Sequence, residues 1–117
     1  MPAIASITDP AFRAARMLKL MRDNNISDSA AHLLLILRAA GADSLTMTSA
    51  SKTMGTSSGS ITGLADNLES RGLIQRRPSA TDRRAIWLDL TPDGNALLDE
   101  ILAEQAAGPA PSIKVPV

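Results

Sequence analysis

Four arginines lie within nine residues of this 117-residue chain, and their guanidinium groups are suited to binding phosphates. They are Arg76, Arg77, Arg83 and Arg84. The segments 73–77 and 85–90 on either side are typical of β-strands, and residues 78–82 between them are typical of a turn. The sequence therefore predicts a β-hairpin with an arginine-rich tip. The alternative is an ordinary solvated hairpin whose arginines bind nothing.

A polar helix is predicted directly before this hairpin. Residues 56–71 carry one apolar stripe, and the opposite face holds mainly glycine, serine, threonine and asparagine. The hydroxyl groups can hydrogen-bond to many base edges, and Asn67 can pair with adenine. A polar helix followed by an arginine-tipped hairpin is the arrangement by which a winged helix-turn-helix contacts duplex DNA.

The other segments complete a fold that is mainly α-helical with a small β-wing, an α+β class. Residues 10–23 predict a helix with Asp9 as a candidate cap, and a second helix is predicted to start at Ser27 or Asp28, to run through Ala40 and to stop at Gly41. A short strand at 45–47 and a short helix capped by Thr46 or Thr48 follow. Thr91 starts the last helix, which gives a winged helix-turn-helix in the order α-α-β-α-α-β-β-α.

Three parts of the chain are distinguished by composition. Residues 1–9 are an N-terminal arm, residues 10–107 form the winged helix domain, and residues 108–117 are a proline-containing flexible tail. An alternative for the tail is that Ile113 and Val115 dock on a partner chain as an added strand.

The composition argues against an enzyme, a metal or cofactor site and a membrane protein. The chain has no cysteine and a single histidine, His32, so the sequence offers no nucleophile–base pair and predicts no enzyme, cofactor or metal site. For His32 we expect a structural or surface role, with effector sensing as the alternative. There is no run of 18 apolar residues and no signal-peptide pattern, which predicts a cytoplasmic protein without a membrane span.

The net charge is zero, but the charges are unevenly distributed. Residues 45–91 carry six cationic and four anionic side chains, a net charge of about +2, whereas residues 92–107 carry only acidic charges. Because this excess is mild, it lowers the affinity for DNA that we expect. The main alternative is a winged helix that serves as a protein-interaction module, which the zero net charge and the acids Asp66 and Glu69 near the presumed DNA face favour.

The combined motifs resemble the MarR-type transcriptional regulators, over about residues 26–100. The motifs that carry the resemblance are Leu45-Thr46, Met54-Gly55, Ile61-Thr62-Gly63-Leu64, Asp66-Asn67-Leu68-Glu69, Arg71-Gly72-Leu73-Ile74, Arg76-Arg77, Asp82-Arg83-Arg84 and Leu90-Thr91-Pro92-Asp93-Gly94. The most specific feature is the Asp-x-Arg of the wing followed by Leu-Thr-x-x-Gly at the expected distance. Where the family commonly has Glu-Leu-Ala, this chain has Ser49-Ala50-Ser51, so we expect weaker packing of the third helix, with Trp87 as a candidate to fill the space.

The resemblance implies a regulator that binds double-stranded DNA. The helix around residues 57–67 would enter the major groove, and Arg84, oriented by a hydrogen bond from its guanidinium to Asp82, would reach the minor groove. The candidate DNA-binding residues are Lys52, Ser57, Ser58, Ser60, Thr62, Asn67, Arg76, Arg77, Asp82, Arg83 and Arg84.

The resemblance also implies a homodimer formed by the N- and C-terminal helices. The candidate dimerisation residues are Phe12, Met17, Leu18, Leu98, Ile101 and Leu102. Because the last helix is short, the alternatives are a dimer with a reduced interface and a monomeric chain. A further alternative is that these residues belong to the core. A small-molecule effector is not identified, since Phe12 and Trp87 are the only aromatic side chains.

Overall fold

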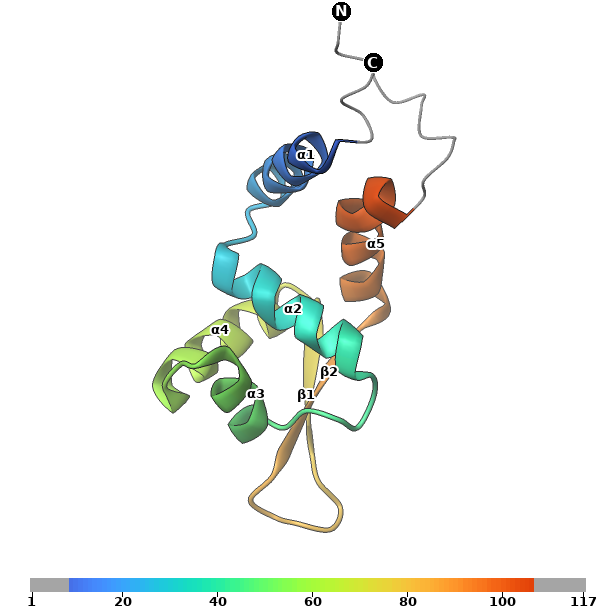
Figure 1. The fold of residues 1–117 in the computed structure, drawn as a ribbon. Coiled ribbons are helices and arrows are strands. Elements are labelled where there is room, and N and C mark those ends of the chain that lie inside the picture. The colour runs from blue at the N-terminus through green and yellow to red at the C-terminus, as the bar shows by residue number, and fades with distance from the viewer. Residues whose placement is uncertain (1–8, 107–117) are drawn as a thin grey trace, which may run out of the picture. The chain divides into compact units, whose positions relative to one another are not determined.

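The computed structural model describes residues 9–106, and the side chains of residues 9–102. The described chain forms two compact units. One contains α1 (Pro10–Asp23) and residues 99–106. The other, residues 28–98, contains α2 (Asp28–Ala40), α3 (Met47–Met54), α4 (Ser58–Ser70), β1 (Ile74–Pro78), β2 (Ile86–Leu90) and the start of α5 (Pro92–Ala106) (Figure 1). The predicted arm, apart from Asp9, and the tail at 108–117 with its docking strand lie outside the described residues.

The helices begin where local capping groups predict. Four side-chain oxygens accept a hydrogen bond from a backbone N–H of the first turn, which satisfies a donor that the helix leaves open. The capping residues are Asp9, Thr46, Ser57 and Thr91. At the other ends, Gly41 and Gly55 follow α2 and α3 with φ of 86° and 68°, the left-handed region that favours glycine. The predicted caps Asp9 and Thr91 and the predicted end of α2 at Gly41 are confirmed, Thr46 and not Thr48 caps α3, and α4 covers residues 58–70 of the predicted 56–71.

The start of α3 explains how Ser49 serves where the family commonly has Glu, and why the predicted strand at residues 45–47 does not form. Thr46 Oγ1 accepts from Ser49 N at 3.1 Å, and Ser49 Oγ accepts from Thr46 N at 2.8 Å, so Ser49 closes a capping box with its hydroxyl. Because Thr46 is already the cap, the strand predicted at residues 45–47 is reduced to a single bridge between Thr46 and Trp87. Ala50 is fully buried, so this small residue does belong to the core.

The wing is an antiparallel hairpin that extends beyond α3 and α4 (Figure 1). In its register, Ile74 pairs with Leu90 and Arg76 with Leu88, whereas Arg77 pairs with Trp87. Paired residues share a face of the sheet and successive residues alternate between faces. Arg76 therefore lies on the face that carries the buried Ile74 and Leu88, and Arg77 lies on the opposite face.

The core of the larger unit is formed by its helices and the inner face of the hairpin. α4 packs against α2, α3 and β1, and β2 packs against α2 and α3. The largest fully buried side chains are Leu33, Leu34, Ile61, Leu68, Ile74, Leu88 and Leu98. Burial of such side chains contributes about 1.5–3 kcal/mol each and is the main source of stability for this unit. None of the described helices has the length and apolar character needed to cross a bilayer.

The candidate dimerisation residues differ in exposure. The side chains of Phe12 and Leu18 on α1 are 39% and 51% exposed, so they are accessible to another molecule. Leu98 and Ile101 are only 1% and 5% exposed, so the chain buries them itself. For these two residues the burial fits the core role, the alternative that the sequence left open. Met17 and Leu102 are half-buried.

Candidate nucleic-acid interface

The outer surface of α4 is polar and exposed, as predicted. Ser57 caps the helix and also donates to Ser60 Oγ at 3.0 Å, while Thr62 Oγ1 donates to Ser58 O at 2.8 Å. These hydroxyls already have partners within the helix, although their oxygens can still accept. In the part of the chain that the structure describes, the side chains of Ser58 and Asn67 make no hydrogen bond, so they are the groups most available to bases.

A hollow of about 570 Å³ lies beside α4, on the side of α2. Gly59 and Gly63 contribute to it because they have no side chain, and a Cβ at either position would meet no atom within 4 Å. Ser29 and His32 of α2 line the opposite wall, and no carboxylate lines the hollow. His32 is exposed here, consistent with the expected surface role. Sequence reasoning did not select Ser29, because periodicity does not show which neighbour a polar helix position faces.

The wing tip presents two of the four arginines. Arg83 and Arg84 are exposed, and neither guanidinium has a partner among the described residues. The loop that carries them is ordered by side-chain acceptors. Ser79 Oγ accepts from the N–H groups of Thr81 and Asp82 at 3.2 and 3.1 Å. The two cations are therefore presented on a structured turn that can approach phosphate groups.

Asp82 has a different role from the one that the family resemblance implied. Its Oδ1 accepts from the backbone N–H of Arg84 at 3.0 Å, which closes an Asx-type turn. The expected hydrogen bond to the Arg84 guanidinium is not formed within the described wing, where Asp82 accepts from the backbone of Arg84 instead. Asp82 thus shapes the loop, and the Arg84 side chain is exposed.

Arg76 is bound to α4 and does not lie at the tip. Its Nε donates to Glu69 Oε1 at 3.0 Å, its Nη2 donates to Asp66 Oδ1 at 2.6 Å, and its backbone N–H donates to Glu69 Oε2 at 3.0 Å. The pKa of Glu69 is lowered, first by the backbone hydrogen bond and then by the guanidinium of Arg76. The two acids near the polar face of α4 therefore share one arginine of the wing, which offsets one of their two negative charges.

Arg77 forms a second internal cluster on the other face of the hairpin. Its Nε donates to Asp89 Oδ2 at 2.9 Å, and its Nη2 donates to Asp43 in the loop before α3. These partners raise the pKa of Arg77 above its usual value, Asp89 contributing most. The prediction that Arg76 and Arg77 belong to the arginine tip is corrected, because both are in strand β1 and pair with carboxylates. Lys52, in contrast, is exposed in the last turn of α3.

The Glu69–Arg76 contact predicts a pH-dependent stability. A carboxylate with a lowered pKa contributes stability above the unfolded value of about 4.3, and this contribution is lost as the pH falls through the lowered pKa. We expect E69Q to be less stable than wild type at pH 7 and the difference to shrink toward pH 3. Thermal unfolding of both proteins at each pH measures this. A difference that does not change with pH would contradict it, since the other acids are common to both proteins.

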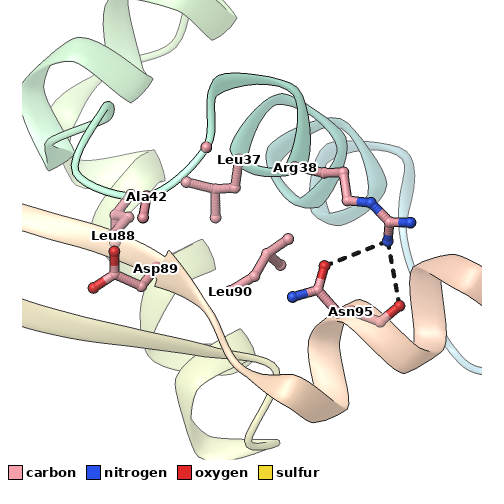
Figure 2. A pocket seen from close by; sticks show the side chains of 8 residues that line it. Leu37, Arg38, Ala42, Leu88, Asp89, Leu90 and Asn95 are labelled. Carbon is pink, nitrogen blue, oxygen red and sulfur yellow. Dashed lines mark hydrogen bonds between the residues drawn. The ribbon is translucent and has the colours of Figure 1, made fainter.

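A second hollow, of about 170 Å³, lies where the end of α2 meets β2 and α5 (Figure 2). Leu37, Leu88 and Leu90 supply apolar walls. Arg38 Nη1 reaches across to Asn95, with 3.3 Å to the backbone oxygen and 3.4 Å to Oδ1. This volume is below the roughly 300 Å³ of typical ligand pockets, so the hollow supports no effector. Within residues 9–102, no three histidine or acidic side chains are grouped to hold a metal ion.

The family model described as MarR family matches residues 24–85, the segment that contains α2, the helix-turn-helix, β1 and the loop of the wing. The chain belongs to the MarR family. The family is one of transcriptional regulators and not of enzymes, in agreement with the sequence prediction. The winged helix fold, including the hairpin wing, is also confirmed.

Two MarR-family relatives illustrate the likeness in sequence. The transcriptional repressor MprA of Escherichia coli (strain K12) is 34% identical over 87 residues, which are 74% of this chain and 49% of that protein. The HTH-type transcriptional repressor MdtR of Bacillus subtilis (strain 168) is 32% identical over 91 residues, which are 78% of this chain and 57% of that protein. The chain spans about half the length of these relatives.

Solved structures of MarR-family proteins show the same fold. A crystal structure of an S. aureus MepR–DNA complex has a TM-score of 0.73 and 25% sequence identity, over 79% of this chain and 74% of that one. A mutant MarR from E. coli, complexed with operator DNA, has a TM-score of 0.69 over 89% of this chain and 71% of that one. Its identity is 20%, so this second comparison concerns the fold alone.

Proposed function

We propose that this chain is a transcriptional regulator of the MarR type that binds double-stranded DNA. In this proposal, α4 enters the major groove, and Arg83 and Arg84 of the wing lie at the minor groove. The observation that carries the proposal is the pair of unpartnered arginines at the tip of a wing whose base is bound to α4 through Arg76. The MepR chain with a similar fold was solved in complex with DNA, which supports DNA binding by this chain.

The residues proposed to contact DNA are divided by function. Ser58 and Asn67 face the bases, with the oxygens of Ser57, Ser60 and Thr62 as further acceptors. Lys52, Arg83 and Arg84 face phosphates or the minor groove, where arginine responds to groove width. Because the base-reading groups are small and uncharged, we expect DNA shape to contribute much of the selectivity.

We further propose a homodimer that acts in the cytoplasm. The exposed Phe12 and Leu18 on α1 are its candidate contacts, since an exposed phenyl ring and an isobutyl group lose unfavourable hydration when a second copy covers them. A dimer would place two α4 helices on one duplex, which predicts a DNA site with two-fold symmetry.

A salt titration tests the DNA-binding proposal. Each phosphate neutralised by the protein releases counterions, so log K for a duplex should fall by about 0.9 per unit of log salt for each such contact. We expect a measurable slope for the wild-type chain in fluorescence anisotropy with a labelled duplex. Light scattering on the same samples gives the oligomeric state. A flat titration, or no binding at low salt, would favour the alternative of a protein-interaction module.

A further inference from the structure

Arg76 connects the wing to α4 through both its side chain and its backbone. Glu69 is the main partner, because one carboxylate oxygen accepts from the Arg76 backbone N–H and the other accepts from Nε at 3.0 Å and from Nη2 at 2.8 Å. Asp66 accepts only from Nη2. Glu69 thus binds the backbone of strand β1, whereas Asp66 binds only the end of the Arg76 side chain. The Arg76 side chain is 26% exposed in this arrangement.

A two-stranded hairpin is marginally stable unless other elements hold it. Here the residues beyond Pro78 extend past the helices, so the direction of the tip depends on how strand β1 is held at its base (Figure 1). The contact at Glu69 fixes that base to the helix that carries the polar surface. A recognition surface whose two parts are already aligned loses less entropy on binding than one whose parts move independently.

We propose that the Glu69–Arg76 contact is a positioning device, which holds the wing so that α4 and the tip arginines meet one duplex together. This inference rests on the proposed function. It assigns Arg76 no contact with DNA, since its Nε and Nη2 donors are bound to carboxylates of its own chain. Glu69, an acid near a DNA-binding face, then improves binding through its effect on geometry.

The substitution E69Q separates this proposal from simple electrostatics by the sign of its effect. Removing a negative charge near DNA should tighten binding if charge alone matters. In glutamine one of the two carboxylate oxygens becomes an NH2 group, which cannot accept, so either the backbone N–H or the guanidinium of Arg76 loses its acceptor. If the contact positions the wing, E69Q should weaken DNA binding. D66N is the matched control, because it removes the same charge and leaves the hold on the strand, and its binding should be unchanged or tighter.

A double-mutant cycle completes the test. We expect E69Q to weaken duplex binding when Arg83 and Arg84 are present, and to leave it unchanged or tighter in an R83A/R84A background, with a coupling of about twofold to 100-fold. Thermal unfolding of each protein establishes that it is folded at the binding temperature. Tighter or unchanged binding by E69Q in the wild-type background would overturn the positioning proposal, as would an equal loss in both backgrounds. Failure of wild-type binding itself would instead reject the proposed function.

Discussion

Replacing both Arg83 and Arg84 with alanine should weaken binding to duplex DNA by at least about 1–3 kcal/mol, which corresponds to roughly 5- to 150-fold. The two side chains are exposed and unpartnered in the described structure, so their loss removes no ion pair within the chain. Ser79 and Asp82 hold the loop through backbone N–H groups that remain in the variant. Fluorescence anisotropy with a labelled duplex at fixed salt measures the effect, and thermal unfolding should change little.

The variant R83K/R84K separates charge from the guanidinium group. Lysine keeps the charge, and with it the phosphate attraction, but lacks the planar fork of donors and is more strongly hydrated. We expect this variant to bind DNA with an affinity between those of wild type and R83A/R84A. Equal affinity of R83A/R84A and wild type at the same salt would contradict the role of the wing, whatever the behaviour of the lysine variant.

Local signals made most of the secondary structure predictable. Asp9, Thr46, Ser57 and Thr91 cap helices within three residues of their own position, and Gly55 ends α3, so a short window of sequence contains the interaction that sets each boundary. The wing was predictable for a similar reason, since a turn segment lies between two β-rich segments. The predicted strand at residues 45–47 failed because the same residues also hold the cap of α3.

Contacts between distant residues were not predictable from such windows. The four arginines look equivalent in sequence, yet Arg76 and Arg77 bind carboxylates up to 34 residues away, and only Arg83 and Arg84 are unpartnered among the described residues. Strand alternation does contain a partial signal. Ile74 and Arg76 share a face, so an inward Ile74 places Arg76 toward the helices. Which acid it meets there depends on how α4 packs on β1.

For the candidate dimerisation residues, too, the sequence did not show which groups cover each side chain. Apolar positions at helical spacing mark a face that is removed from water, but the spacing does not tell whether the chain itself or a second copy covers it. Leu98 and Ile101 are buried by the chain, and Phe12 and Leu18 are not. A homodimer interface built on α1 alone would bury little surface, and small interfaces bind weakly. The dissociation constant of the dimer therefore tests whether α1 alone forms the interface.

The first turn of α5 makes a close contact with the turn before β1, so two motifs that are distant in sequence meet here. Thr91 N–H donates to Leu73 O at 3.1 Å, and Thr91 Oγ1 donates to Gly72 O at 2.6 Å. This brings the first turn of the helix against the backbone of residues 72–73, just before β1, with Gly94 buried at the contact. A Cβ on Gly94 would lie 2.1 Å from Leu73 O. The Arg-Gly-Leu-Ile and Leu-Thr-x-x-Gly motifs of this chain therefore form one contact.

The variant G94A should be destabilised by about 1–3 kcal/mol, because the overlapping atom belongs to the backbone and the first turn of α5 has to shift. For a domain of this size, that corresponds to a Tm lower by about 5–15 °C. Calorimetry or circular dichroism on heating measures it. G63A is the matched control, since a Cβ there has no atom within 4 Å and alanine favours a helix interior by up to about 1 kcal/mol. If G94A were as stable as G63A, the close approach of α5 to Leu73 would be refuted, and with it the contact between the two motifs.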